Sequence, residues 1–285
     1  MPELPEVETV RRGLAPIVVG ARLRRVEARR ADLRFPLPAS FAARLEGARI
    51  EALDRRGKYL VAPLSTGESL VMHLGMSGRF TVDGGDRPDG RYYAAGADPR
   101  HDHVVFELDG PSGSARVVYN DPRRFGLMDL VPSDGLDQCR HLAGMGPEPL
   151  SEAFAASTFN AALKGRAAPI KAALLDQRVV AGVGNIYACE ALFRAGVSPR
   201  RSARSVAGAR GIRLWSALRA VLLEAIEAGG SSLRDFAASD GALGYFQHRF
   251  RVYDRAGEPC PVCRAPVRRF AQSGRSTFYC GVCQR

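Results

Sequence analysis

The chain has 285 residues, of which 41 are Lys or Arg and 30 are Asp or Glu, so its formal net charge at pH 7 is +11. The length suits two domains or one large domain, and a hydrophobic fraction of 46% excludes a disordered chain. No basic segment followed by an apolar stretch opens the chain, and no run approaches the ~18 apolar residues of a membrane span. We therefore expect an intracellular protein whose basic excess binds a polyanion.

The opening stretch MPELPEVETV predicts a short amphipathic helix that begins near Pro5. Its apolar residues recur at spacings of three and four, and proline and carboxylates are typical of the first helical turn. This explanation covers Pro5, Glu6 and Glu8 but leaves Pro2 and Glu3 without a role. If the initiator methionine is removed, Pro2 becomes a secondary amine. Because an α-amino group titrates near ~8, part of that amine is a neutral nucleophile at physiological pH.

Four stretches after this helix are apolar or alternate apolar with polar residues, and clusters of Gly, Pro and Asp separate them. This pattern is typical of a β-sandwich or barrel. The stretches are residues 49–64, 69–82, 101–110 and 114–131, with a surface loop expected at 84–99. We expect an N-terminal domain at 1–133 and a hinge at 134–150, because residues 131–150 contain three prolines and show no sustained periodicity.

Residues 151–247 are predicted to form a helical domain. Its first helix is expected to start with Ser151 as the cap, and its last helix to stop at Gly229 and Gly230. Between them, VAGVGN at 180–185 is a glycine-rich turn that opens a helix. Unpaired N–H groups at such a turn can bind an anion, although most such turns only reverse the chain.

The cysteines fall into two classes by spacing. Cys139 and Cys189 stand alone and are most simply buried or idle thiols. The other four form two C-x2-C pairs separated by sixteen residues, which predicts a zinc ribbon at 248–285 with Cys260, Cys263, Cys280 and Cys283 as ligands. The zinc ion would be structural, because four thiolates leave no open coordination position. Residues 245–285 contain eight Arg against one Asp and one Glu, so we expect this tail to contact phosphate.

Only three of the 41 basic residues are lysines: Lys58, Lys164 and Lys171. Lysine can lose its proton near neutral pH and arginine cannot, so a position that stays Lys in this background is a candidate for proton transfer. The alternative is that any one of these three lysines is present by chance and has no role in proton transfer.

Several motifs, in order over nearly the whole chain, resemble the formamidopyrimidine-DNA glycosylase family, bacterial enzymes that remove oxidised purines from DNA. They are PELPEVE at the start, GKYL around Lys58, HLGMSG around Met76, HDH at 101–103, DPRRFG around Arg123, VVAGVGNIYACEALF, and the cysteine ribbon with QSGRSTFYC. The resemblance implies an α+β multidomain fold. An N-terminal helix and β-sandwich would be joined to a helix-two-turns-helix domain and a four-cysteine zinc ribbon.

The resemblance also implies catalytic residues. The Pro2 amine would attack the anomeric carbon of the damaged nucleotide and expel the base, and the resulting iminium would promote strand cleavage by β,δ-elimination. Glu3 would transfer protons, and Lys58 would contact the reacting sugar and its phosphate. Arg275 would grip the phosphates flanking the lesion and assist the second elimination. Glu6 would orient the N-terminus, with a plain capping role as the alternative.

The damaged nucleotide must leave the duplex to reach Pro2, and side chains must fill the hole. The family positions for this role are Met76, Arg123 and Phe125, with Arg123 facing the orphaned cytosine and Phe125 wedged between stacked bases. The resemblance implies further DNA contacts, which position the duplex without reading sequence, by His101, Arg166 and Asn185. Lys171 is a further candidate DNA contact. The loop at 239–246 would read the flipped base.

The implied partner is double-stranded DNA containing oxidised bases, bound by a monomer in the bacterial cytoplasm, with one zinc ion and no organic cofactor. Two alternatives stay open. One is an enzyme like endonuclease VIII, which shares the architecture but prefers oxidised pyrimidines. The other is a zinc-ribbon lesion-binding protein without catalysis, although Pro2, Glu3 and Lys58 are all present.

Overall fold

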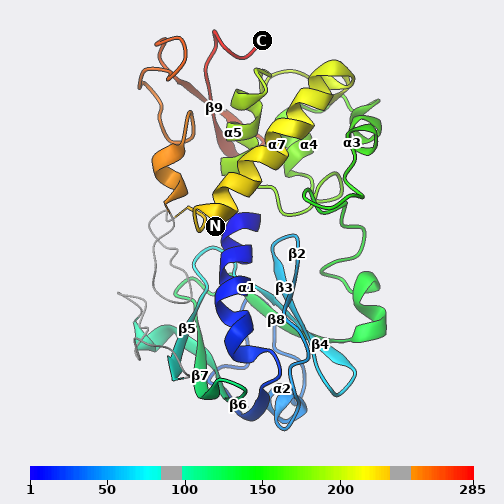
Figure 1. The fold of residues 1–285 in the computed structure, drawn as a ribbon, viewed down its shortest axis with the longest axis vertical. Helices are drawn as coiled ribbons and strands as arrows, with labels where there is room; N and C mark the ends of the chain where they lie inside the picture. Colours follow the sequence, from blue (N-terminus) through cyan, green and yellow to red (C-terminus); the bar gives the residue numbers. More distant parts are fainter. Residues whose placement is uncertain (85–97, 232–244) are drawn as a thin grey trace. The chain divides into compact units, whose positions relative to one another are not determined.

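The computed structural model describes residues 1–84, 98–231 and 245–285 (Figure 1). Their contacts divide the chain into two compact units: Met1–Ala143 with Ala228–Tyr245, and Gly144–Glu227 with Phe246–Arg285. Among the described residues, none of the helices has the length and apolar character needed to cross a bilayer.

The first unit is a helix packed on a β-sandwich, which confirms the predicted fold class. Helix α1 (Leu4–Val18) contacts β2 and β3 of one sheet and β6 of the other (Figure 1). Its apolar side chains, including Val10 and Leu14, join both sheets in one core. One antiparallel sheet has the order β1 (Arg22–Ala28), β6 (Asp102–Gly110), β7 (Gly113–Asn120), β5 (Arg79–Gly84), and the other β2 (Asp54–Arg56), β3 (Tyr59–Pro63), β4 (Glu68–His73), β8 (Leu127–Pro132). The described part of the unit also has three short helices: α2 (Phe41–Leu45), η1 (Pro99–His101) and η2 (Ser133–Gln138).

Strand β1 is absent from the predicted elements, and its geometry explains why. Its pairing with β6 shifts register between Leu23 and Arg25, so the buried residues Leu23 and Val26 are three positions apart instead of two or four. A β-bulge of this kind breaks the alternation on which the prediction relies. The remaining positions of RLRRVEA are mostly charged, as suits a strand at a sheet edge.

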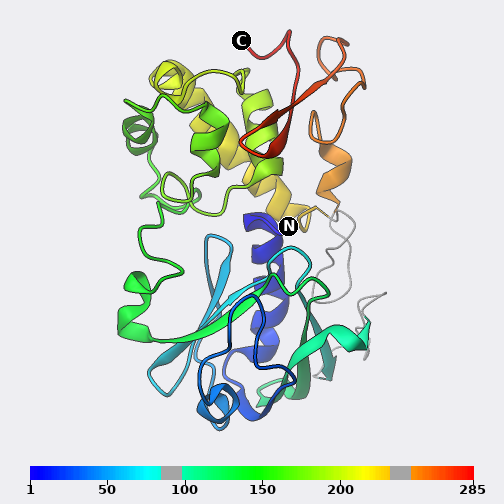
Figure 2. The ribbon, with the colours of Figure 1, turned by 180° about the vertical axis from the view of Figure 1, so that it is seen from behind.

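The second unit combines five helices and a β-hairpin in the part of the chain that the structure describes. The helices are α3 (Ala156–Leu163), α4 (Ile170–Leu175), α5 (Asn185–Arg194), α6 (Ala203–Val206) and α7 (Ala209–Glu227). After the short η3 (Phe246–Arg249), strands β9 (Arg268–Gln272) and β10 (Arg275–Tyr279) form the hairpin of the predicted ribbon, and β10 packs beside α5 (Figure 2). The predicted turn before α5 and the glycine stop after α7 are both confirmed.

The predicted start of the first helix at Ser151 is wrong. The N–H of Ser151 donates to the carbonyl of Glu148, so Ser151 belongs to a turn, and α3 begins at Ala156. Phe154 is fully buried within that turn, and its carbonyl accepts a hydrogen bond from Trp215 Nε1 on α7. Tertiary packing therefore holds residues 151–155 outside the helix.

The division between the units falls inside the expected hinge at 134–150. Two segments are grouped differently from the expected domains. Residues 228–245 group with the sandwich, because Ser231 is bonded to Glu6. The ribbon groups with the helices, because Lys171 and Asn185 donate hydrogen bonds to Ser276 in β10.

Candidate active site and nucleic-acid contacts

The start of α1 is buried and tightly bonded. Pro2 is buried, and Glu3, only 2% exposed, is the N-cap of the helix. The carboxylate of Glu6 reaches back, with Oε2 accepting from the Glu3 N–H at 2.8 Å. Its other oxygen, Oε1, accepts from the N–H of Ser231 at 2.8 Å and from the Ser231 hydroxyl at 2.9 Å. Glu6 therefore caps the helix and fixes the backbone beside Pro2 with the same carboxylate.

Lys58 lies in the turn between β2 and β3 and is buried. This turn is joined to α1 through Arg55, whose Nε donates to Glu8 Oε2 at 3.2 Å and whose Nη1 donates to the carbonyl of Gly57 at 3.0 Å. Burial raises the pKa of Glu8, but hydrogen bonds from Arg11 and Arg12 outweigh this effect and lower the pKa to about 2. Glu8 is thus an ionised anchor between the helix and the lysine turn, a role that its position in the sequence does not indicate.

His73 is a neighbour of Lys58 that the sequence analysis did not single out. It is paired across the sheet with Tyr59, the residue after Lys58, and the two rings lie 4.7 Å apart. Burial lowers the pKa of His73 to about 4, and the positive charge of Lys58 adds to this effect. Because His73 Nδ1 accepts from the Gly75 N–H at 2.9 Å, the neutral ring carries its proton on Nε2. The only signal in the sequence was the place of His73 in the HLGMSG motif.

The structure brings the three predicted void-filling residues together on two adjacent loops. Met76 lies on residues 74–78, here called the Met76 loop, and Arg123 and Phe125 lie on residues 121–126, the Arg123 loop. Phe125 is 47% exposed, and the Arg123 guanidinium carbon lies 5.1 Å from the centre of its ring. Gly75 has φ +64°, and a Cβ at this position would lie 2.3 Å from the carbonyl carbon of Phe125. Only glycine allows the two loops to approach this closely.

Asp121 holds the two loops together. Its buried carboxylate accepts from the Ser77 hydroxyl at 2.6 Å and from the Arg123 N–H at 3.3 Å through Oδ1. Oδ2 accepts from the Gly126 N–H at 2.8 Å and the Tyr119 hydroxyl at 3.3 Å. Four donors therefore converge on one carboxylate, whose only signal in the sequence is its place in the DPRRFG motif.

In the second unit, Lys171 is 1% exposed, and its ammonium donates to Thr277 Oγ1 at 2.7 Å and to the carbonyl of Ser276 at 3.0 Å. Asn185 Nδ2 donates to the same carbonyl at 2.9 Å. Both side chains therefore hold strand β10 directly behind Arg275, which is exposed at its start. The expected DNA contact by Lys171 is corrected to this internal role.

Two further predicted DNA-contact residues have other partners. Arg166 Nη1 pairs with Asp176 Oδ2 at 3.2 Å, and the Arg166 side chain remains 40% exposed. His101 is half-buried at the end of η1, and its carbonyl accepts from the N–H of Asp121 at 3.0 Å. His101 is thus joined through the backbone to the Arg123 loop.

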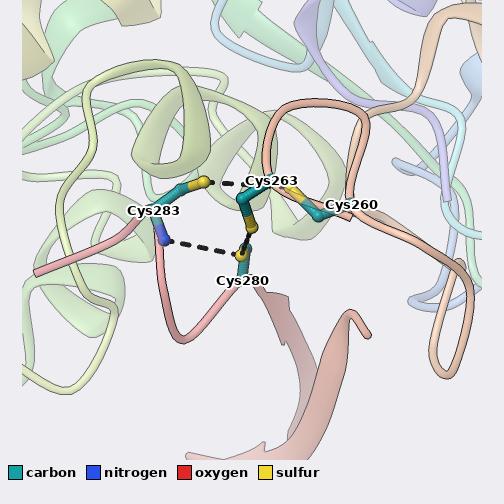
Figure 3. Close-up of side chains that lie close together, drawn as sticks. All are labelled: Cys260, Cys263, Cys280 and Cys283. Atoms are coloured by element: carbon teal, nitrogen blue, oxygen red, sulfur yellow. Dashed lines mark hydrogen bonds between the residues drawn. The ribbon is translucent and has the colours of Figure 1, made fainter. Parts of the chain in front are cut away.

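The four ribbon cysteines converge on one point (Figure 3). Their Sγ atoms all lie within 4.8 Å of one another, with Cys260 and Cys283 separated by 3.9 Å and Cys263 and Cys280 by 3.4 Å. A tetrahedral zinc ion with Zn–S bonds of ~2.3 Å requires sulfur atoms about 3.8 Å apart. The thiolate set therefore fits one structural zinc ion.

Glu190 on α5 supports the chain that enters the ribbon. Its buried carboxylate accepts the N–H groups of Arg251, Val252 and Tyr253 at 2.9, 3.0 and 2.8 Å. Burial raises the pKa of Glu190, and these three hydrogen bonds oppose that rise. No sequence pattern indicated this contact, because its partners lie about sixty residues away.

The loop expected to read the flipped base, 239–246, lies largely outside the described residues. The structure describes its flanks, where Ser231 and Tyr245 form an antiparallel bridge and the Tyr245 N–H donates to the carbonyl of Ala228.

Three family models match the chain. They are the formamidopyrimidine-DNA glycosylase N-terminal domain over residues 1–128, the formamidopyrimidine-DNA glycosylase H2TH domain over 145–237, and the zinc finger found in FPG and IleRS over 257–285. Together they cover most of the sequence and correspond to the sandwich, the helices and the cysteine hairpin described above.

Individual relatives match over the full length. A formamidopyrimidine-DNA glycosylase from Methylobacterium sp. (strain 4-46) is 58% identical, with 100% of this chain and 99% of the relative covered. The structure of a MutM (Fpg) protein from Thermus thermophilus is 46% identical with a TM-score of 0.85, covering 99% and 98% of the two chains. A Lactococcus lactis FPG mutant in complex with a Fapy-dG containing DNA is 32% identical with a TM-score of 0.86, covering both chains completely.

Proposed function

The chain belongs to the formamidopyrimidine-DNA glycosylase family, and we propose from this premise that it excises oxidised purines from double-stranded DNA and then cleaves the strand. The observation that carries the proposal is the 58% identity to a formamidopyrimidine-DNA glycosylase over the whole chain. The Lactococcus relative bound to Fapy-dG containing DNA supports formamidopyrimidines as substrates, and we propose 8-oxoguanine as the second oxidised purine.

Pro2 is the proposed nucleophile once Met1 has been removed. Its amine nitrogen forms a bond to the anomeric carbon, the glycosidic bond breaks, and the damaged base leaves with a proton. The amine loses its own proton, the ring oxygen takes up a proton as the sugar ring opens, and the resulting iminium acidifies the C–H bond of the neighbouring sugar carbon. Loss of this C–H proton expels the 3′ phosphate, and a second elimination expels the 5′ phosphate.

Glu3 and Lys58 are the proposed proton-transfer groups. Both are buried, Glu3 beside Pro2 in the chain and Lys58 in the turn that Arg55 and Glu8 hold against α1. Glu6 supports this arrangement because its hydrogen bond to the Glu3 N–H fixes the peptide that follows the nucleophile. A carboxyl group and an ammonium next to the reacting sugar can protonate the ring oxygen and assist both eliminations.

In the second unit, the proposed phosphate contacts are Arg275, Asn185 and Arg166, and in the first unit His101. Arg275 is exposed at the tip of the ribbon hairpin, and its strand is held by Lys171 and Asn185. The zinc ion at the four cysteines stabilises the hairpin that presents Arg275. It takes no part in the chemistry.

Met76, Arg123 and Phe125 are proposed to fill the space that the flipped nucleotide leaves. Their common position on two bonded loops supports this role, since Arg123 and Phe125 are exposed while their backbones are fixed through Asp121 and Gly75. We further propose that the protein acts as a monomer in the bacterial cytoplasm, at the chromosomal DNA that carries its substrate.

The test compares excision from three duplexes with the same sequence, containing 8-oxoguanine, a formamidopyrimidine or thymine glycol. The proposal predicts release of both purine lesions with strand cleavage, and slower release of the pyrimidine. The alternative of a pyrimidine-preferring enzyme is open because the Lactococcus protein, 32% identical, was also solved with an oxidized pyrimidine containing DNA. A clear preference for thymine glycol would favour that alternative. Tight lesion binding without release of any base would favour a non-catalytic binder.

A further inference from the structure

A second exposed aromatic ring lies close to the Arg123 loop. Phe35 is 42% exposed, on a short turn closed by the bridge between Asp32 and Pro36. The guanidinium carbons of Arg34 and Arg140 each lie 5.5 Å from the centre of its ring. This repeats the arrangement of Arg123 over Phe125.

The Phe35 turn is attached to the Arg123 loop by direct contacts. The N–H of Arg34 donates to the carbonyl of Gly126 at 3.0 Å, and Arg124 Nη1 lies 3.8 Å from Asp32 Oδ1. Leu33, within the turn, is buried in the core of the sandwich unit and anchors the turn there. The two aromatic rings therefore belong to one fixed surface of that unit.

That surface is strongly basic. Ion pairs and contacts with the two aromatic rings connect five arginines and two aspartates on this surface, so the formal charge of the group is +3. The group consists of Arg30, Arg34, Arg123, Arg124, Arg140, Asp32 and Asp129. Arg140 stays 63% exposed although it pairs with Asp129. Guanidinium groups fit phosphate oxygens, and aromatic rings pack against sugars and bases. This combination is typical of a nucleic-acid contact and not of a plain solvated face.

We propose that the arginine-aromatic surface formed by Arg34, Phe35 and Arg140 binds the backbone of duplex DNA beside the lesion, on the strand that carries the opposite base. The assignment of the strand rests on the proposed function, in which Arg123 of the adjoining loop faces that base. Arg34 and Arg140 contact phosphates, and the ring of Phe35 packs against the sugar between them. This contact extends the protein–DNA interface beyond the base pair from which the nucleotide is flipped.

The test measures affinity for a duplex with a stable abasic-site analogue opposite cytosine, as a function of salt concentration. Each lost phosphate contact lowers the slope of log K against log salt by about 0.9, so the double variant Arg34→Ala/Arg140→Ala should lower it by about 2. Phe35→Ala should weaken binding about fivefold with little change in slope, because a contact but no charge is removed. The double variant should also shorten the protected region of the undamaged strand.

Two controls separate charge from general damage. Arg34→Lys/Arg140→Lys keeps both charges and should keep the parent's slope. Arg24→Ala removes an exposed arginine of β1, paired with Glu107 outside this surface, and should leave slope and protection unchanged. If the double alanine variant keeps the parent's slope of log K against log salt and the parent's protection of the undamaged strand, the inference is overturned. This holds whether the surface then has no ligand or binds a protein. Because these are binding measurements, this failure is distinct from failure of the proposed function, in which the parent releases no oxidised purine.

Discussion

Replacing Asp121 by Asn tests how the Met76 and Arg123 loops are held together. The new NH2 group must face one pair of donors, either the Ser77 hydroxyl with the Arg123 N–H or the Tyr119 hydroxyl with the Gly126 N–H. A hydroxyl can rotate and accept from the NH2 group, but a backbone N–H cannot. We expect the amide to turn toward Ser77, because the Arg123 contact is longer, at 3.3 Å, than that of Gly126 at 2.8 Å.

The backbone N–H of Arg123 therefore loses its carboxylate partner. The hydrogen bonds that remain at this position are weaker, because their acceptor is no longer charged. The Arg123 N–H keeps a contact of 3.3 Å to Ser77 Oγ, so the cost is the loss of charge-assisted hydrogen bonding and not an unsatisfied donor. Hydrogen bonds to charged groups contribute about 1.5–3 kcal/mol, so we expect the free energy of unfolding to fall by about 2 kcal/mol. This corresponds to a decrease in Tm of about 4–8 °C. Since the released N–H belongs to Arg123, the preference for cytosine opposite the lesion should also fall.

The assay combines urea unfolding with excision of 8-oxoguanine opposite cytosine and opposite adenine. Ser77→Ala is the matched control, because it removes one hydroxyl and leaves the carboxylate to Arg123 and Gly126, so it should cost less than Asp121→Asn. If Asp121→Asn keeps both the parent's stability and its opposite-base preference, the idea that this carboxylate holds the two loops together is refuted. Loss of stability with unchanged preference would limit Asp121 to a structural role.

Three further predictions concern the chemistry, the metal and the acid stability of the helix. Glu3→Gln should abolish base excision while sparing DNA affinity, since it removes a proton-transfer group and no phosphate contact; excision at the parent's rate would refute the role of Glu3. Cys280→Ser should lose zinc and DNA binding together, measured by metal analysis and a binding titration, whereas Cys139→Ser, outside the ribbon, should lose neither; DNA binding retained in the metal-free variant would show that the ribbon is dispensable. Because the folded pKa of Glu8 is lowered from 4.5 to about 2, its ionisation stabilises the fold above pH 4.5, and this contribution is lost as pH falls toward 2. Glu8→Gln should therefore lower stability at pH 7, and the difference from the parent in urea unfolding should shrink near pH 2; a constant difference at both pH values would contradict this linkage.

The sequence predicted features that depend on local patterns. Strand alternation predicted a sandwich or a barrel, and the family resemblance selected the sandwich. The two C-x2-C pairs predicted the metal site, because a zinc ribbon sets both spacing and ligand type over a short stretch. The glycine-rich turn before α5 was predicted for the same reason. Strand β1 was missed because its bulge removes the alternation. The N-cap of helix α3 was placed four residues early, at Ser151 instead of Ala155, because the burial of Phe154, which holds the turn, involves α7.

The parts of the site that sequence could not predict depend on contacts between distant residues. The role of Asp121 depends on its hydrogen bond from Ser77, which is distant in the sequence, and the DPRRFG motif alone does not indicate it. The role of Glu190 likewise depends on hydrogen bonds from residues 251–253, which pack on α5. Lys171 was a candidate DNA contact, whereas its ammonium is buried against β10, a placement that is rare for lysine and that its local sequence does not indicate. Glu8 resembled an ordinary charge near a helix start, and its bond to Arg55 shows that it also anchors the Lys58 turn.

The most direct test of the account is borohydride trapping on an 8-oxoguanine:C duplex, followed by digestion and mass spectrometry of the covalent adduct. We predict DNA attached to the nitrogen of an N-terminal Pro2, which would establish removal of Met1, the nucleophile and the iminium in one result. Pro2→Gly, which keeps an N-terminal amine, and Lys58→Ala serve as comparison variants for the site of attachment. An adduct on Lys58 or another lysine, or bound DNA without any adduct under conditions that trap an active control enzyme, would contradict the central role of Pro2.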